Sequence, residues 1–554
     1  MKKKFFILFL LPLVVKAQDY FAEADSCLKV KNYACAATAY DLYLKQDSES
    51  NGVAYLSLVN WTKSGNLEKA FSSLKIYIRN NRLNNLVFFS KGMLNDSNLI
   101  QLRADPRWPP ILARVTRIED SVRAIDDKKY DSAMLVQTAI ENWRPSDSIQ
   151  KHRNDEGRTL YAEIKAWNLF PEVKAKWLSL QFKINDSLTM ASLVVLPENY
   201  DSRKSYPLLF FLHGAVSVNT GFLRWVHDNK ETAGWNRYYT KYGHDVIMVY
   251  AHGNREYNWM YPDKGFYMVP AILRQIKKIV NVDDNRVFVS GHSNGATGSF
   301  SYLMKQPSAF AGFYGFNTRP VVQTGGTFLK NALNRSFFNV STDQDYYFPP
   351  GANDSLDLIM KSINADYQDH RYNGFPHWFP QFDESEPAYV LLFKDLNHRI
   401  RNPFHSDIYW ECDNLKYGTC DWIQITGLDT AAEKVSWHKD INFGVHKWII
   451  LGDKIKRIER DTLLSAFKFP RRSAAIKAHY SNNEFFIETS RVGSFELFIS
   501  PEMVDLSRKI KIILNGKLVD EEKVGIDKEY MLAHYEKDLD RRSVWVNRIE
   551  VKIK

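Results

Sequence analysis

The hydrophobic pattern of the chain changes near residue 177. Before it, apolar side chains recur at helical spacing, and from Trp177 they alternate with polar ones. Continuous apolar runs follow, as expected of strands buried on both faces. Such runs lie at 207–212, 245–250, 286–290 and 337–340, with helical segments at 272–280 and 299–305. Strands that alternate with helices predict an α/β fold over residues 176–398, a mostly parallel sheet covered by helices.

The pattern changes again after residue 399, where helix signals fade and strand-like runs dominate. These runs, at 485–487, 495–499 and 510–514, are separated by turn residues. The pair Asn515-Gly516 stands between apolar pairs and predicts a β-hairpin, because both central turn positions need positive φ. We therefore expect a β-rich C-terminal domain of the sandwich type over residues 399–554.

The segment after the N-terminus contains an internal repeat. The turn at 31–33 recurs at 65–67, and Ala36 recurs as Ala70, a shift of 34 residues. This period is similar to that of tetratricopeptide repeats, in which small residues stand where paired helices approach. The resemblance predicts a helical domain over residues 18–118. Two roles for it stay open, the binding of a protein partner and simple packing against a neighbouring domain. Residues 119–175 are charged and helix-prone, and predict a helical connector.

The first 17 residues have the pattern of a signal peptide. Lys2, Lys3 and Lys4 precede an apolar core of about eleven residues, and Ala17 ends a small-residue cleavage site. This core is too short to span a bilayer, and no comparable apolar run follows. The sequence thus predicts a periplasmic or secreted protein without a membrane span.

Composition and charge narrow the function classes. The 554 residues are 45% hydrophobic and 14% aromatic, which is ample for packed cores. The formal charge of +10 is interleaved along the chain and lacks a long basic block, which argues against nucleic-acid binding.

Four cysteines form two close pairs, Cys27 with Cys35 and Cys412 with Cys420. Local disulfides and free thiols remain alternatives for each pair. No Cys/His spacing indicates a metal site.

One motif indicates nucleophilic catalysis. Residues 291–295, Gly-His-Ser-Asn-Gly, match G-x-S-x-G after a predicted strand and before a predicted helix. A strand–turn–helix elbow needs glycine on both flanks, because a Cβ there would collide with neighbouring backbone. The helix N-terminus behind Ser293 also favours developing negative charge. Ser293 is therefore the candidate nucleophile.

A tetrahedral oxyanion needs two N–H donors aimed at it. The backbone N–H of Asn294, directly after the nucleophile, is the first candidate. The second should come from the loop after the strand at 207–212, where we favour Ala215 over Gly214. His213 in that loop is expected to anchor it and not to act as a base, because it precedes the nucleophile in chain order.

The acid and the base should follow Ser293 in that order along the chain. Two carboxylates compete after the strand at 335–340. Asp345 is favoured for its D-x-x-x-P setting at a loop tip, and Asp343 is the alternative, with an Asx turn as its structural role. Either would fix the tautomer of a catalytic imidazole.

His377 is the candidate base. It lies in a Gly/Pro-bounded segment at 374–378, from which an imidazole can reach the elbow. His370 would instead be fixed within a strand, and His398 and His405 lie at the predicted domain junction, where structural roles are expected.

Together these residues resemble the α/β-hydrolase superfamily, specifically its secreted polyhydroxybutyrate-depolymerase-like and feruloyl-esterase-like branch. The resemblance covers residues 177–398 and rests on 212–214, 291–295, Asp345 and 374–377. It implies a serine esterase that acts on small-molecule or polymeric esters, including acylated carbohydrates, through an acyl-enzyme and without a cofactor.

Two other functions stay open. One is a serine peptidase of the prolyl-peptidase type on the same fold, and the other is a catalytically degenerate adaptor that binds partners through the helical repeats. Sugar stacking by Trp410, Trp422 and Trp437 is a further idea, against which we favour their burial in the core.

Overall fold

The computed structural model describes residues 20–48, 50–83, 96–117, 156–173, 176–216, 234–260, 265–345, 347–446, 448–451, 457–460 and 462–553. It divides into two compact units, Met1–Lys129 and Tyr130–Lys554. The predicted signal peptide and residues 119–155 of the predicted connector lie outside the described residues, and the finer domain boundaries stay predictions. Every helix in the described ranges is too short or too polar to cross a lipid bilayer.

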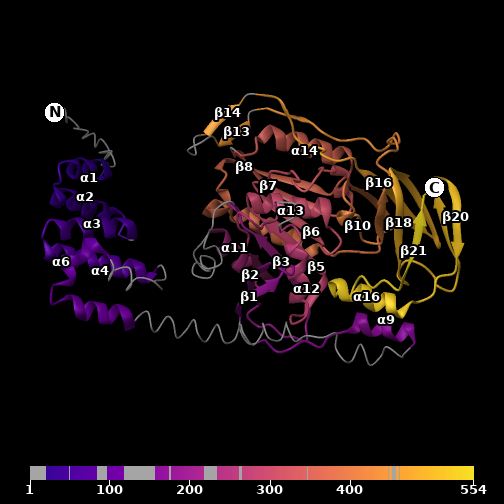
Figure 1. Ribbon diagram of the computed structural model, residues 1–554, viewed down its shortest axis with the longest axis horizontal. Coiled ribbons are helices and arrows are strands. Elements are labelled where there is room, and N and C mark those ends of the chain that lie inside the picture. The colour runs from indigo at the N-terminus through magenta and orange to yellow at the C-terminus, as the bar shows by residue number, and fades with distance from the viewer. Residues whose placement is uncertain are drawn as a thin grey trace, which may run out of the picture. The chain divides into compact units, whose positions relative to one another are not determined.

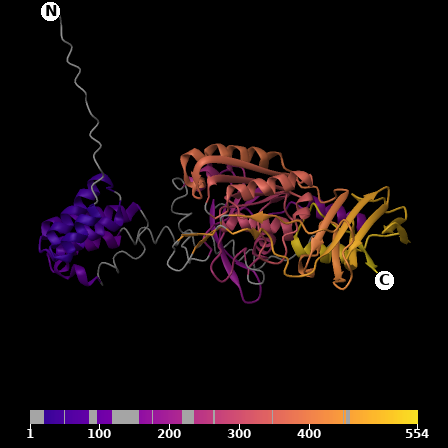
Figure 2. The ribbon, with the colours of Figure 1, turned by 90° about the horizontal axis from the view of Figure 1, so that it is seen from above.

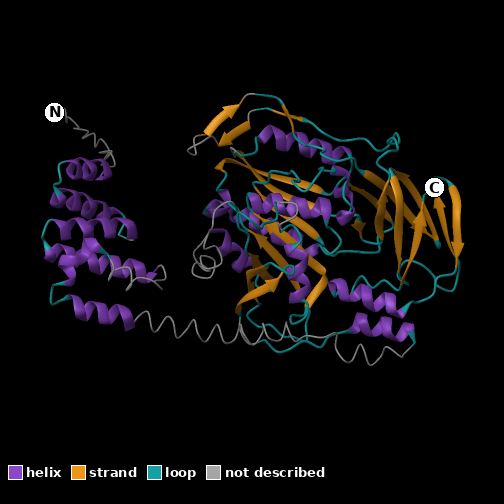
Figure 3. Cartoon of the chain, viewed as in Figure 1, coloured by secondary structure: helices purple, strands orange, loops and turns teal. Residues whose placement is uncertain are grey.

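The first unit consists of paired helices (Figure 3). They are α1 (Tyr20–Lys29), α2 (Tyr33–Gln46), α3 (Asn51–Lys63), α4 (Leu67–Leu83), η1 (Ser97–Leu99), α6 (Ile100–Arg103) and a helical segment at 108–117. The side chain of Asn32 caps α2 by accepting a hydrogen bond from the N–H of Cys35, and Asn66 makes the same bond to Lys69 in α4. Two asparagines 34 residues apart thus cap α2 and α4 in the same way, as the predicted repeat requires. The assignment to tetratricopeptide repeats stays a prediction.

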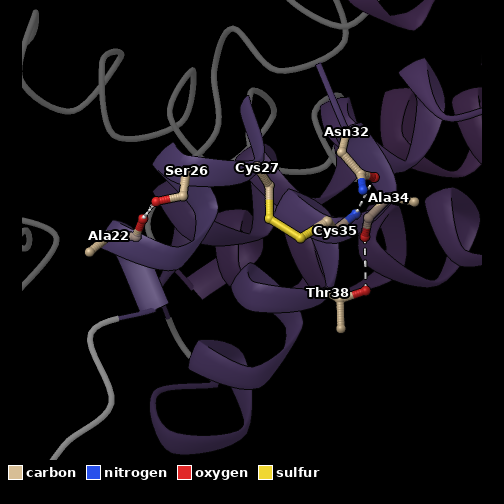
Figure 4. Close-up of a disulfide and its surroundings, with 7 residues drawn as sticks. All are labelled: Ala22, Ser26, Cys27, Asn32, Ala34, Cys35 and Thr38. Carbon is tan, nitrogen blue, oxygen red and sulfur yellow. Dashed lines mark hydrogen bonds between the residues drawn. A yellow bond between two sulfur atoms is a disulfide. The ribbon is translucent and has the colours of Figure 1, made fainter. Parts of the chain in front are cut away.

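The two cysteine pairs differ. Cys27 of α1 and Cys35 of α2 form a disulfide that joins the two helices (Figure 4). Cys412 and Cys420 are buried free thiols. Burial raises the pKa of Cys412 to about 12 and raises that of Cys420 well above its ordinary value. A protonated, buried thiol packs as a small apolar group, so the second pair has a core role.

The second unit contains an eight-stranded sheet with the order β1-β2-β4-β3-β5-β6-β7-β8 (Figure 1). The strands are β1 (Trp177–Lys183), β2 (Thr189–Val195), β3 (Tyr206–Leu212), β4 (Ile247–Ala251), β5 (Val282–Gly291), β6 (Gly312–Phe316), β7 (Ser336–Gln344) and β8 (Tyr367–Pro376). β1 pairs antiparallel with β2 and β2 antiparallel with β4, and all pairings from β4 to β8 are parallel. The predicted mostly parallel sheet is confirmed, and β6 is a strand that the prediction missed.

Helices cover both faces of this sheet. They are α11 (Gly234–Tyr242), α12 (Met268–Ile276), α13 (Asn294–Lys305), α14 (Pro350–Ser362) and α15 (Glu386–His398), with the short helices η3 (Leu329–Leu333), η4 (Phe379–Gln381) and η5 (Asp383–Ser385). Leu208, Phe210 and Leu212 of β3 share a core with α12, α13 and α14, whereas Leu209 and Phe211 share one with α11 and α15. This alternation explains why the run at 207–212 is continuously apolar.

The C-terminal strands form two larger sheets that share one hydrophobic core. One sheet has the order β10-β11-β18-β21 and the other β20-β19-β17-β16-β9, and they gather beside the central sheet in both views (Figure 2). The strands are β9 (Asp407–Cys412), β10 (Thr419–Cys420), β11 (Ile423–Leu428), β16 (Ala474–Ser481), β17 (Glu484–Ser490), β18 (Val492–Ile499), β19 (Ile510–Leu514), β20 (Lys517–Glu522) and β21 (Asn547–Lys552). Asn515 and Gly516 both have positive φ, 49° and 80°, and join β19 to β20 as the predicted hairpin.

Smaller elements complete this region. Two-stranded ribbons pair β12 (Gly444–Val445) with β15 (Leu464–Ser465), and β13 (Trp448–Leu451) with β14 (Arg457–Arg460), and η6 (Leu415–Tyr417) precedes β10. Two helices, α9 (Gly157–Ala166) and α16 (Lys528–Asp538), pack into the shared core. The prediction missed α16, and residues 167–173 of the predicted helical connector are not helical.

The three tryptophans considered for sugar binding have different environments. Trp410 and Trp422 are fully buried, and each donates its indole N–H to a backbone carbonyl, of Tyr417 and His405 respectively. Trp437 is half-buried beside Tyr409. The expected core role is confirmed for the first two.

Candidate active site

Ser293 lies at a sharp turn between β5 and α13. Its backbone has φ 58° and ψ −120°, in the positive-φ region that a residue with a Cβ rarely adopts. The N–H of Ser293 donates to the carbonyl of Phe316 at the end of β6, at 3.0 Å. The side chain is partly exposed, while the residues around the turn are mostly buried. The turn therefore presents one hydroxyl at the carboxyl edge of the sheet.

The two flanking glycines of the motif are required by close backbone contacts. A Cβ on Gly295 would lie 1.8 Å from the carbonyl oxygen of Leu212, and one on Gly291 would lie 2.4 Å from the carbonyl carbon of Gly295. Neither neighbour is a flexible side chain, so the backbone itself would have to move. This is the collision that the sequence motif predicts for a strand–turn–helix elbow.

His377 and Asp345 form a buried pair. Asp345 directly follows β7 and His377 directly follows β8, so two parallel neighbours bring them to the same edge. The Nδ1 of His377 lies 3.0 Å from each carboxylate oxygen of Asp345. Asn317 and the backbone N–H of Tyr347 also donate to this carboxylate, at 3.1 and 2.8 Å. Because a carboxylate oxygen accepts, Nδ1–H of His377 is the donor in this pair.

The alternative acid has a different partner. Asp343 accepts a hydrogen bond from the backbone N–H of Gly374, at 2.8 Å, and so holds the segment before His377. This contact joins residues 31 positions apart and so differs from the local Asx turn that the sequence suggested for Asp343.

The three histidines that the sequence analysis set aside lie in other environments. The ring of His370, in β8, stacks on that of Phe338 in β7. His398 is exposed at the end of α15. The Nε2 of His405 lies 2.7 Å from a carboxylate oxygen of Asp421.

His377 is tied to the turn of Ser293 through His292. The Nε2–H of His292 donates to the backbone carbonyl of His377 at 2.9 Å, and the two rings lie 4.9 Å apart. Burial, together with the charge that His377 would carry, lowers the pKa of His292 to about 3. His292 is thus a neutral donor that fixes the segment of His377 beside Ser293. His292 stands at the first x of the G-x-S-x-G motif, a position at which the motif allows any residue. The sequence therefore gave no reason to single it out.

The candidate oxyanion donors lie beside the same serine. A Cβ on Gly214 would lie 3.0 Å from the Cβ of Ser293, so this loop approaches Ser293 closely. Ala215 follows with φ 51°, and Asn294 is the first residue of α13.

His213 holds that loop in place. Its Nδ1–H donates to the carbonyl of Gly214 at 2.7 Å, and its Nε2 accepts from the N–H of Gly253 at 3.0 Å. Burial lowers the pKa of His213 to about 4, so the ring stays neutral at neutral pH. These contacts are those of the anchoring role expected of His213.

Two aromatic side chains that the sequence did not single out pack against His377. The rings of Tyr347 and Trp378 lie 4.4 and 5.4 Å from the imidazole, both in edge-to-face geometry. Tyr347 lies two residues after Asp345, and Trp378 directly follows His377. This nearness in the sequence was the one signal that could have identified them. Asn317 was also missed, because it follows the unpredicted strand β6.

Comparison with known proteins gives only remote similarities. No protein-family model matches the sequence, and no curated protein matches it. A solved thermostable esterase is 21% identical, with a TM-score of 0.34 over 41% of this chain and 64% of the esterase. This chain thus spans less than two thirds of that esterase.

Two other solved structures are similar at the same level. An S-formylglutathione hydrolase from Staphylococcus aureus is 15% identical, with a TM-score of 0.29 over 40% of this chain and 98% of that one. A ferulic acid esterase is 17% identical, with a TM-score of 0.31 over 40% and 96%. Similarities this low assign neither an activity nor a substrate to this chain, so the functional argument rests on the geometry of the site.

Proposed function

We propose that the protein is an exported serine hydrolase that cleaves carboxylic esters through Ser293, His377 and Asp345. The observation that carries the proposal is the buried pair of His377 and Asp345. The backbone carbonyl of His377 accepts a hydrogen bond from His292, the residue next to Ser293. A nucleophile, a base and an orienting acid in this chain order are the parts that acyl transfer needs.

The residues divide the reaction as follows. Asp345 accepts from Nδ1–H of His377 and so presents Nε2 as the base. As Nε2 takes the hydroxyl proton, the oxygen of Ser293 forms a bond to the ester carbonyl carbon, and the negative charge moves to the carbonyl oxygen. The backbone N–H groups of Ala215 and Asn294 are the proposed donors to that oxyanion. The imidazolium then gives its proton to the alcohol oxygen as the carbon–oxygen bond breaks, leaving an acyl-enzyme that water hydrolyses by the same steps.

Export is part of the proposal. It rests on the signal-peptide pattern of residues 1–17, and the Cys27–Cys35 disulfide supports it because such bonds persist in oxidising compartments. The helical repeats remain a candidate surface for a protein partner.

An ester panel tests the assignment directly. Short-chain nitrophenyl esters, feruloyl esters, acetylated xylan and peptide nitroanilides are offered to the wild type and to Ser293→Ala. We expect ester cleavage by the wild type and a loss of about 10⁶-fold in kcat in the variant, as for serine triads generally. The melting temperature of the variant should match that of the wild type. Faster cleavage of peptide anilides than of any ester would replace the esterase by a peptidase, and no turnover at all would favour the adaptor.

A further inference from the structure

The backbone at Phe316 and Asn317 joins the turn of Ser293 to the strand that precedes Asp345. The carbonyl of Phe316, the last residue of β6, accepts from the N–H of Ser293 at 3.0 Å. The N–H of Asn317 donates to the carbonyl of Val340 in β7 at 2.8 Å. Asn317 itself has φ 52°, in the left-handed region that asparagine enters more readily than most residues. The residue type thus permits the turn that ends β6 beside the site.

The side chain of Asn317 is buried, and its amide nitrogen has two partners inside the site. The Nδ2 of Asn317 lies 2.7 Å from Oγ1 of Thr342 and 3.1 Å from Oδ2 of Asp345. The hydroxyl of Thr342 in turn donates to the carbonyl of Pro376, at 3.4 Å. Because Pro376 is the residue before His377, one amide connects the carboxylate of Asp345 to the segment that carries the imidazole.

These partners fix which way the amide points. A carboxylate can only accept, and the hydroxyl of Thr342 gives its proton to Pro376, so both partners of Asn317 are acceptors. A flipped amide would place Oδ1 against both of them. In the part of the chain that the structure describes, Oδ1 of Asn317 has no hydrogen-bond partner, so the two N–H donors alone orient the side chain.

We propose that Asn317 is a positioning residue, which holds the carboxylate of Asp345 against Nδ1 of His377 and favours its ionised form. This inference rests on the proposed function and adds a residue to it. The oxygen that Asn317 binds, Oδ2, also lies 3.0 Å from Nδ1 of His377. A hydrogen bond donated to a carboxylate favours its charged form. An ionised Asp345 in a fixed place is what keeps the proton of His377 on Nδ1 and stabilises the imidazolium.

The first test removes the amide without straining the backbone. Asn317→Gly keeps a residue that adopts φ 52° freely. With a short-chain nitrophenyl ester we expect kcat to fall about tenfold and KM to stay within about twofold, because a hydrogen bond to a charged group is lost at a residue that does not bind substrate. The melting temperature of the variant shows whether it is folded.

The second test replaces the donor by a charge. Asn317→Asp keeps the shape of the side chain, but it puts a second carboxylate within about 6 Å of Nδ1 of His377. That charge favours the imidazolium, so the pH at which kcat falls on acidification should rise by about one unit. The other groups that face His377 are Asp345, the ring of Tyr347 and the neutral ring of His292, and the variant leaves all three in the chain.

Asn339→Asp is the matched control. Asn339 is buried in β7, and its Nδ2 donates to Oδ1 of Asp369 at 2.8 Å. Its Oδ1, like that of Asn317, has no hydrogen-bond partner among the described residues. The same change thus places a carboxylate beside a buried aspartate that the proposed reaction does not use. Both kcat and its pH profile should stay as in the wild type.

The outcomes separate this inference from the proposed function. An unchanged kcat in Asn317→Gly, or an unchanged pH profile in Asn317→Asp, would show that Asn317 only packs beside Asp345, and the inference would be withdrawn while the esterase stands. The same pH shift in Asn339→Asp would also overturn it, because any buried charge in the sheet would then be sufficient. A wild type without Ser293-dependent cleavage of the ester would instead remove the proposed function itself.

Discussion

The two edges of the central sheet both bury polar groups, but they hold them in different ways. At the carboxyl edge, Asp345 is surrounded by hydrogen-bond donors, and the imidazoles of His213 and His292 are kept neutral by burial. At the opposite edge, cations from the sheet region are paired with carboxylates.

The carboxylates of these pairs lie in the C-terminal region, Asp413 after β9, Asp421 between β10 and β11, and Asp540 after α16. Lys305 at the end of α13 meets Asp413 at 3.2 Å, with both side chains fully buried. Arg335, just before β7, meets Asp421 at 2.6 Å. Arg401 meets Asp540 at 2.7 Å.

The two edges differ in how a buried charge is stabilised. Burial lowers the pKa of Arg401, but the charge of Asp540 outweighs it and holds that pKa above its ordinary value, so the cation stays charged. In the site, Asp345 accepts from Asn317 and from the backbone N–H of Tyr347, and it is paired with His377. The carboxyl edge thus satisfies its carboxylate with hydrogen-bond donors, whereas Arg401 at the other edge is held by an opposite charge. The two should respond differently to the same kind of mutation.

The largest effect is expected at the carboxyl edge and on rate alone. Asp345→Asn keeps the size of the side chain, but its amide would face Nδ1 of His377 and favour the wrong tautomer. We expect kcat to fall about 10⁴-fold with little change in melting temperature. Asp343→Asn, which alters only the contact to Gly374, should cost less than tenfold. If Asp343→Asn instead caused the large loss in kcat and Asp345→Asn the small one, Asp343 would be the acid.

A smaller free-energy effect, but on stability, is expected at the junction. Asp413→Leu leaves the ammonium of Lys305 buried without its carboxylate, and we expect a loss of about 3–5 kcal/mol in the free energy of unfolding. The double variant Lys305→Met with Asp413→Leu removes both charges and should be more stable than the single one. Urea denaturation followed by tryptophan fluorescence measures this. A double variant as unstable as the sum of its single variants would show that the pair itself is not what matters.

The smallest effect is a pH dependence that comes from the site's neutral histidines. Their folded pKa values, about 4 for His213 and about 3 for His292, lie below the value of about 6.5 in an unfolded chain. The unfolded state therefore binds more protons below pH 6.5, and stability falls as the pH is lowered from there toward 4. Each group contributes a slope of up to about 1.4 kcal/mol per pH unit.

Variants isolate this contribution. In His213→Gln, the difference in unfolding free energy between pH 6 and pH 5 should shrink by about 1 kcal/mol. His398→Gln, at an exposed position in α15, should leave it unchanged. Denaturation curves at both pH values give the comparison, and an unaltered slope in His213→Gln would mean that His213 is not the proton-binding group.

Much of the site could be predicted because its signals are local. Gly291 and Gly295 are required by backbone contacts within one turn and with the preceding strand, and that pattern marked Ser293. The hairpin at Asn515-Gly516 was predicted for the same reason, since positive φ at two adjacent residues restricts the residue types. The continuously apolar run at 207–212 likewise indicated a strand that is buried on both faces.

Sequence alone predicted most strands of the central sheet and the turn at Ser293, because each depends on the conformation of a few adjacent residues, but it missed β6 and α16. Only the tertiary structure decided the partners. It paired His377 with Asp345, left Asp343 to the N–H of Gly374, joined Cys27 to Cys35 and kept Cys412 and Cys420 apart from any disulfide. It also set Trp378 against His377, and Lys305 against a carboxylate 108 residues away. Such contacts depend on the register and order of strands distant in the sequence, which no short pattern of residues specifies.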